Sequence, residues 1–116
     1  MQPKQRAHAL TAVVDGLEAE LRRQHLWERE PPSAQLLTST QPFCVDTLAL
    51  SQWLQWRLIP RMRRILAGDG ELPTRSAIHP YAEDCFEHLE DPSALLLLIE
   101  RFDGLIRNDT ETATTH

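Results

Sequence analysis

The sequence has little of what disulfide networks, membrane spans or secretion require. Its 2 cysteines, Cys44 and Cys85, lie far apart without CxxC spacing, so we expect reduced thiols that pack as small apolar residues, with a disulfide as the alternative. No apolar run approaches the length that crosses a bilayer. The stretch from Met1 to His8 lacks the charged and then apolar pattern of a signal peptide. These absences predict a cytoplasmic protein with no membrane partner.

Motifs that bind phosphate or metal are also missing. There is no GxxxxGK[ST] loop and no GxGxxG turn, which argues against nucleotide hydrolysis. Cys85 and His88 alone would provide too few ligands for zinc, and His25 or His79 could complete a set only through a geometry that the sequence does not specify. We therefore expect no metal, no cofactor and no catalytic residue. A cysteine–histidine nucleophile formed across the fold is the alternative, and no motif supports it.

Basic residues are fewer than acidic ones. The chain of 116 residues carries 17 acids and 12 bases, a net charge of -5, which argues against a bulk affinity for nucleic acid or anionic lipid. All bases except Lys4 are arginines, which pair with carboxylate or phosphate and stack on aromatic rings. A codon bias toward arginine would explain the same composition. The content of 41% hydrophobic and 25% charged residues is that of one folded domain.

Apolar residues recur with helical spacing in the first part of the chain. They predict a helix from about Pro3 to Glu28 with one buried stripe, made of Leu10, Val13, Val14, Leu17 and Leu21. Pro31 and Pro32 are expected to end this helix, because proline disfavours the helical conformation of its predecessor. A short helical turn is predicted from Ser33 to Leu37 in the connection that follows.

A second helix is predicted from a cap at Asp46 or Ser51 to about Ala67, before Gly68. Its apolar residues cover a broader arc than one core-facing stripe requires, so this helix should be central; they are Leu54, Leu58, Ile59, Met62, Ile65 and Leu66. Pro60 lies in the interior, where the missing N–H and the ring clash cost about 3 kcal/mol or more. A kink or a break is therefore predicted at Pro60.

The third and fourth helices follow a loop rich in turn-forming residues. Pro80 suits the first position of the third helix, whose apolar edge is Tyr81, Cys85, Phe86 and Leu89. Asp91 and Pro92 predict the N-cap and first position of the fourth helix, whose stripe is Leu95, Leu98, Ile99, Phe102, Leu105 and Ile106. Leu96 and Leu97 fall outside this stripe, so either another element covers them or they form a patch for self-association.

Four amphipathic helices predict an all-α, single-domain, up-and-down bundle over residues 1–107. No segment alternates with the period of a strand. Residues 108–116 form a polar, threonine-rich stretch, which predicts a disordered tail. Upstream of the second helix, Phe43 and Val45 are expected to return to the core.

One face of the second helix is the candidate binding surface. It gathers two tryptophans, a proline and three arginines, here called the Trp/Arg face: Trp53, Trp56, Arg57, Pro60, Arg61 and Arg64. Aromatic residues beside arginines occur at protein interfaces and at sites for single-stranded RNA. The alternative is that both tryptophans are buried beneath residues 31–45, while the arginines pair with acids from neighbouring helices.

Several motifs around this face carry a family resemblance. They are Ser39-Thr40-Gln41-Pro42-Phe43, Asp46-Thr47, Trp53-Leu54-Gln55-Trp56, Leu58-Ile59-Pro60-Arg61-Met62, Leu72-Pro73 and Ile78-x-Pro80-Tyr81. With the flanking helices they resemble the YqcC-like family of small bacterial proteins over nearly the whole chain. The resemblance implies a helical bundle and carries over no catalytic residue. Its members are often encoded near a tRNA pseudouridine synthase, which implies an accessory role in tRNA modification.

Three functions follow as hypotheses. The first is an interaction module that docks on an enzyme, such as a tRNA pseudouridine synthase, through the Trp/Arg face. The second is direct binding of tRNA, in which Arg57, Arg61 and Arg64 meet phosphates and the tryptophans stack on bases. The third is a small-molecule binder or enzyme with a pocket between the second and third helices, near Pro60 and the side chains of Tyr81 and Cys85.

Overall fold

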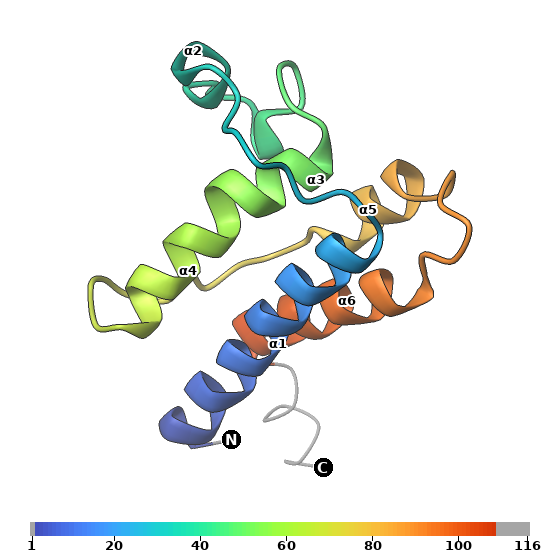
Figure 1. The fold of residues 1–116 in the computed structure, drawn as a ribbon. Helices are drawn as coiled ribbons and strands as arrows, with labels where there is room; N and C mark the ends of the chain where they lie inside the picture. The colour runs from blue at the N-terminus through green and yellow to red at the C-terminus, as the bar shows by residue number, and fades with distance from the viewer. Residues whose placement is uncertain (1, 109–116) are drawn as a thin grey trace.

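A computed structural model describes residues 2–108 of the chain (Figure 1). In order, the elements are α1 (Pro3–Arg23), α2 (Ala34–Leu37), the 3-10 turn η1 (Pro42–Cys44), α3 (Leu50–Trp53), the π turn η2 (Leu54–Leu58), α4 (Ile59–Leu66), α5 (His79–Cys85) and α6 (Ser93–Arg107). Residues 2–108 contain no strand, so the predicted all-α bundle is confirmed. No helix within these residues is long and apolar enough to cross a membrane. The predicted tail comprises residues 108–116, of which residues 109–116 lie outside the described part of the chain.

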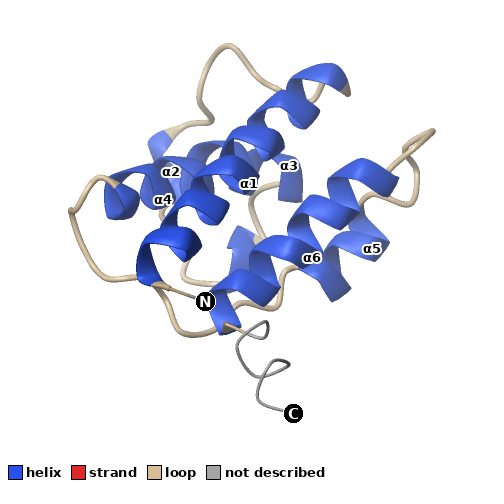
Figure 2. Ribbon diagram, turned by 90° about the horizontal axis from the view of Figure 1, so that it is seen from below, coloured by secondary structure: helices blue, strands red, loops and turns tan. Residues whose placement is uncertain are grey.

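Helix α1 packs against both α4 and α6, and Figures 1 and 2 show it running antiparallel to each. Near its beginning, the Arg6 guanidinium donates to the carbonyls of Leu105 and Ile106 at 2.7 and 2.6 Å. Beyond its end, Gln24 donates to the Asp91 carbonyl at 2.8 Å. The predicted stripe is confirmed, because each of its members is at most 2% exposed: Leu10, Val13, Val14, Leu17 and Leu21.

Helix α1 ends at Arg23, earlier than the predicted Glu28. His25 has a left-handed backbone with φ of 61°, and the Leu26 N–H donates to the Leu21 carbonyl at 2.8 Å. This bond from beyond the cap back into the last turn is the Schellman motif that closes many helices. A local hydrogen bond, and not the later prolines, therefore sets the end of α1.

The second predicted helix is one run formed by α3, η2 and α4. It begins at Leu50 after Ala49, so the predicted caps at Asp46 and Ser51 are wrong. The carboxylate of Asp46 instead accepts a hydrogen bond from the Ser39 hydroxyl at 2.5 Å, and this contact holds Asp46 within the preceding connection.

Pro60 interrupts the regular α-helix, as predicted. Pro60 is the second residue of α4, and the π turn Leu54–Leu58 directly precedes this helix. Here the Ile59 N–H donates to the Leu54 carbonyl, five residues back. Proline has no N–H to donate. The wider π turn before it shifts the backbone hydrogen bonds from four to five residues back, so that the helical run continues past this residue. The run ends at Leu66, where Gly68 adopts φ of 103°, in agreement with the predicted end.

The connection from α4 to α5 takes an extended course that brings it back along the bundle (Figure 1). Its end is held by Asp103 of α6, which is 1% exposed. One carboxylate oxygen accepts bonds from the Ser76 hydroxyl at 2.5 Å and the Ile78 N–H at 3.1 Å, and the other accepts from the His79 N–H at 2.8 Å. Helix α5 begins at His79, so Pro80 is its second residue, and the prediction that Pro80 is the first residue is wrong.

Helix α6 begins at Ser93, so the predicted start at Pro92 is wrong by one residue. Pro92 has ψ of 0°, and Asp91 accepts from the Ser93 N–H at 3.2 Å and from its hydroxyl at 2.6 Å. The Ser93 hydroxyl, followed by its N–H, lowers the pKa of Asp91. The aspartate therefore caps the turn that leads into α6.

The two leucines outside the α6 stripe differ in burial. Leu96 packs half-buried against the core, whereas Leu97 is 67% exposed. Val45, expected in the core, is 49% exposed, because its neighbour Cys44 takes the buried position at 2%. Only Leu97 of the leucine pair is thus left open for the self-association that the sequence suggested.

Replacing Asp103 by Ala is expected to destabilise the fold by about 3 kcal/mol, because the backbone amides of Ile78 and His79 lose their charged acceptor. Urea unfolding followed by circular dichroism measures this loss. The exposed Asp84 of α5 provides the control, since Asp84→Ala should change stability by less than about 0.5 kcal/mol. Equal effects of the two substitutions would contradict the role given to Asp103.

Candidate interaction groove

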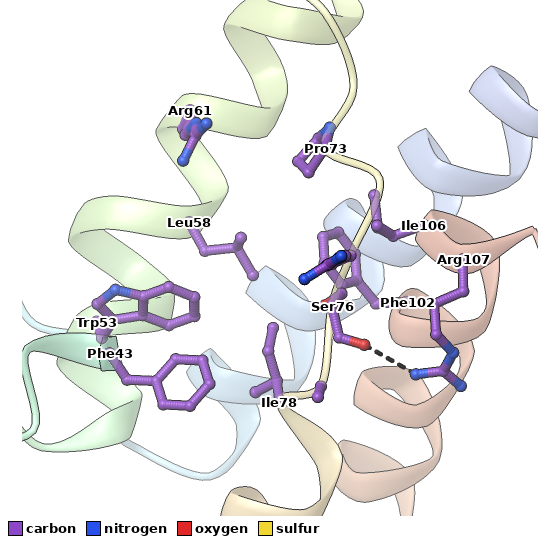
Figure 3. Close-up of a pocket in the computed structure, with 12 residues that line it drawn as sticks. Phe43, Trp53, Leu58, Arg61, Pro73, Ser76, Ile78, Phe102, Ile106 and Arg107 are labelled. Atoms are coloured by element: carbon purple, nitrogen blue, oxygen red, sulfur yellow. Dashed lines mark hydrogen bonds between the residues drawn. The ribbon is translucent and has the colours of Figure 1, made fainter. Parts of the chain in front are cut away.

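A groove opens between the second helical run, residues 73–78 and the end of α6 (Figure 3). Its volume is about 510 Å³. Most of its wall is apolar and comes from distant parts of the chain: Phe43, Trp53, Leu58, Pro73, Ile78, Phe102 and Ile106. Volumes of this order are typical of sites that enclose a small ligand or an anchoring side chain.

Three arginines line the same groove, and none of its described lining residues is acidic. Arg107 donates to the Ser76 carbonyl at 2.8 Å, which Figure 3 marks with a dashed line. Arg61 and Arg75 are exposed, and neither guanidinium forms a hydrogen bond or ion pair with another residue in the range 2–108. The groove therefore combines an apolar wall with the guanidinium groups of Arg61 and Arg75, neither of which forms an ion pair within residues 2–108.

Phe43 fixes an aromatic cluster at one end of the groove. Its ring stacks on Tyr81 with centroids 5.3 Å apart and meets Trp53 edge to face at 5.0 Å. Phe43 and Cys44 have φ of 56° and 49°, a left-handed conformation that costs on the order of 1–3 kcal/mol for each residue other than glycine. The hydrogen bond with the Cys85 thiol, and then burial, raises the pKa of Tyr81. Ring packing and the burial of Cys44 offset the backbone strain and hold the Phe43 ring in the groove wall.

Four members of the Trp/Arg face lie together on the solvent side of the helical run. Trp53, Arg57 and Arg61 line a hollow beside the groove, and Arg61 and Arg64 line the next one. The three arginines are exposed, and no described acid pairs with them, whereas Trp53 is half-buried. Arg57 donates to the Leu37 carbonyl. The alternative interpretation expected buried tryptophans and arginines paired with acids. Trp53 is partly covered, as that interpretation expects, but these three arginines pair with no described acid.

Trp56 and Pro60, the other two members, face α1 instead. They line a separate cavity of about 500 Å³ with residues of α1, and the Trp56 indole N–H donates to Glu28 at 3.0 Å. The small-molecule hypothesis places a pocket near Pro60 with Tyr81 and Cys85. Neither of those two residues lines the cavity beside Pro60, so the structure does not bring these three side chains together there.

Gln55 is a positioning residue that the sequence analysis missed. It is 4% exposed, its side-chain amide donates to the Glu28 carbonyl at 2.7 Å, and its oxygen accepts from the Glu28 N–H at 2.8 Å. The Glu28 carboxylate in turn accepts from Trp56 and, at 3.2 Å, from Gln52. These bonds fasten the loop after α1 to the π turn. The available signal was a polar residue inside the apolar arc of the second helix.

The candidate metal ligands remain dispersed. Within residues 2–108, no group of three or more histidine, cysteine or acidic side chains is placed to hold a metal ion. Cys44 and Cys85 are free thiols. His79 lies 3.7 Å from Glu83 and 3.4 Å from Glu100, so its nearest charged neighbours are surface carboxylates.

Together, these features define a small all-α bundle with an apolar groove lined by arginines. Residues 9–105 match the family described as "DUF446: tRNA pseudouridine synthase C", and the chain belongs to this family.

Relatives of full length support this assignment. The chain is 38% identical over 97 residues to the uncharacterized protein YqcC of Escherichia coli K12, covering 83% of this chain and 89% of that protein. It is 32% identical over 96 residues to an uncharacterized protein of Haemophilus influenzae, covering 83% and 91%. The solution NMR structure of E. coli YqcC aligns with a TM-score of 0.76 at 33% identity over 90% of each chain. The YqcC-like resemblance is thereby confirmed.

A further match is to part of a longer protein. Over 57 residues, the chain is 39% identical to the tRNA pseudouridine synthase C of Pectobacterium carotovorum subsp. carotovorum. The match covers 49% of this chain and 15% of that protein. A segment similar to this chain therefore occurs within a much larger polypeptide.

Gln55→Leu is expected to lower stability by about 2 kcal/mol, because both backbone groups of Glu28 lose their buried partner while the side-chain size changes little. Chemical unfolding followed by tryptophan fluorescence measures the change. Gln35→Leu, at an exposed position of α2, is the matched control and should be near neutral. An unchanged unfolding midpoint for Gln55→Leu would show that the two hydrogen bonds between Gln55 and the Glu28 backbone do not stabilise the fold.

Proposed function

We propose that the chain is a non-catalytic accessory module that acts with a tRNA pseudouridine synthase in tRNA modification. The observation that carries the proposal is the similar segment within the Pectobacterium synthase, of which it makes up 15%. Two functions joined in one polypeptide meet at a high effective concentration, whereas a separate chain needs an interface of its own. The family description, which names the same enzyme, is in line with this association.

The Trp/Arg face is the surface proposed for this contact. Arginine and tryptophan are enriched among residues that dominate interface energies, and a partner can pair with arginines that lack an internal acid. The guanidinium groups of Arg61 and Arg64 have no bonding partner in the described part of the chain, so docking would not first break an ion pair. Trp53 supplies an apolar edge between them and the adjacent groove.

The test measures binding of the purified chain to the synthase from the same organism by calorimetry, together with pseudouridine formation in tRNA. Wild type should bind and raise the yield of modified tRNA. The double variant Arg61→Glu, Arg64→Glu should weaken binding by at least about tenfold, or ~1.4 kcal/mol. Arg101→Glu, at an exposed position of α6, makes a similar reversal of charge elsewhere and should leave binding unchanged. Absence of binding by wild type would refute the accessory role.

Direct tRNA binding is the second candidate, favoured by the exposed row of Arg57, Arg61 and Arg64 along one helical run. Contacts with phosphates release counterions, so the affinity for tRNA should fall steeply as salt is added. Fluorescence anisotropy with labelled tRNA, in the absence of the synthase, measures this dependence. A flat titration at low salt would exclude direct binding and leave the protein contact as the proposal.

A further inference from the structure

The groove beside Trp53 combines an apolar wall with charge of one sign. Leu58, Ile78 and Phe102 belong to the hydrophobic core and also line the groove, where they are at most 9% exposed. The charged residues of the described lining are three arginines, in a chain with 17 acids and 12 bases. An occupant that complements this surface has an apolar side chain between negative charges.

The arginines also limit what can cover the groove. Arg61 and Arg75 come from different walls, α4 and the connection, and neither is paired within residues 2–108. Covering an unpaired guanidinium with apolar surface would remove its hydration without replacement, which is costly. Carboxylates compensate for this loss and form bidentate pairs with arginine. A partner that seals the groove must therefore bring acidic residues.

The ring arrangement favours a protein segment over a nucleotide. Bases bind single-stranded sites by stacking on open aromatic faces. Here one face of Phe43 is stacked on Tyr81, and Trp53 meets Phe43 edge to face. Much of the remaining wall is aliphatic, including Leu58 and Ile106, and suits an apolar side chain (Figure 3).

We propose that the groove binds a segment of the partner protein in which a bulky apolar side chain is flanked by aspartate or glutamate. This proposal deepens the proposed function and rests on it, because it takes the synthase of that function as the partner. The apolar side chain enters the space of about 510 Å³, and the flanking carboxylates pair with Arg61 and Arg75. The groove thus selects an acidic sequence with an apolar anchor.

Ala77 gives the sharpest test, because it is exposed, lines the groove and has a small side chain. Ala77→Glu and Ala77→Arg place long side chains of opposite charge at one position. Calorimetry with the synthase should show at least about tenfold weaker binding for Ala77→Glu and no weakening for Ala77→Arg. Ala94→Glu, at an exposed position of α6, adds the same charge elsewhere and should bind like wild type. Circular dichroism verifies that every variant is folded.

Each other outcome overturns the inference in a distinct way. Equal weakening by both Ala77 variants would mean that the groove is covered without selection for charge. Wild-type affinity in both would remove the groove from the interface and leave the accessory role intact. Failure of wild type to bind would refute the accessory role itself. A photo-crosslinker at Ala77 identifies the occupant, and a crosslink to tRNA or to a segment without acidic residues would also overturn the proposal.

Discussion

Helix α1 packs against both α4 and α6, and the groove exists because these two helices contact α1 more than they contact each other. Both α4 and α6 pack on the apolar surface of α1, while they make few direct contacts with each other. Protein interiors are close-packed, so a space persists only where the backbone prevents neighbouring elements from approaching. Here the space between the second helical run and α6 is bordered by the extended connection, residues 73–78, and not by another helix. The groove is thus a product of topology and does not require unusually small side chains.

The buried carboxylate of Asp103 determines how that connection presents its residues. An unpaired charge would be unfavourable in the core, and three donors from the connection and the start of α5 satisfy this one. Ser76 and Ile78 bond to Asp103, while their neighbours Arg75 and Ala77 stay exposed, and all four residues line the groove. A stabilising contact with α6 thereby fixes the segment that presents Arg75 and Ala77 to the groove.

The sequence predicts the features that depend on local periodicity. The stripe of α1, the interruption at Pro60 and the end at Gly68 each follow from spacing or from the chemistry of one residue, and the structure contains all three. The groove could not be predicted in this way, because its wall joins residues from four separate segments between Phe43 and Arg107. The Trp/Arg face was predicted from a uniform helical angle. The π turn changes that angle, and Trp56 lies with Pro60 toward α1, apart from Trp53.

The local charge of the groove and the net charge of the chain favour different kinds of ligand. Acidic residues gather on the exposed surface of α5 and the turn after it, and include Glu83, Asp84, Glu87, Glu90 and Asp91, whereas the groove is lined by arginines. Screening limits the reach of surface charges to about 8 Å at physiological ionic strength. A short acidic segment in the groove would therefore interact chiefly with the arginines around it. A long polyanion such as tRNA would extend beyond that range and meet the acidic surface as well. The net charge of -5 thus counts against nucleic acid more strongly than against an acidic peptide.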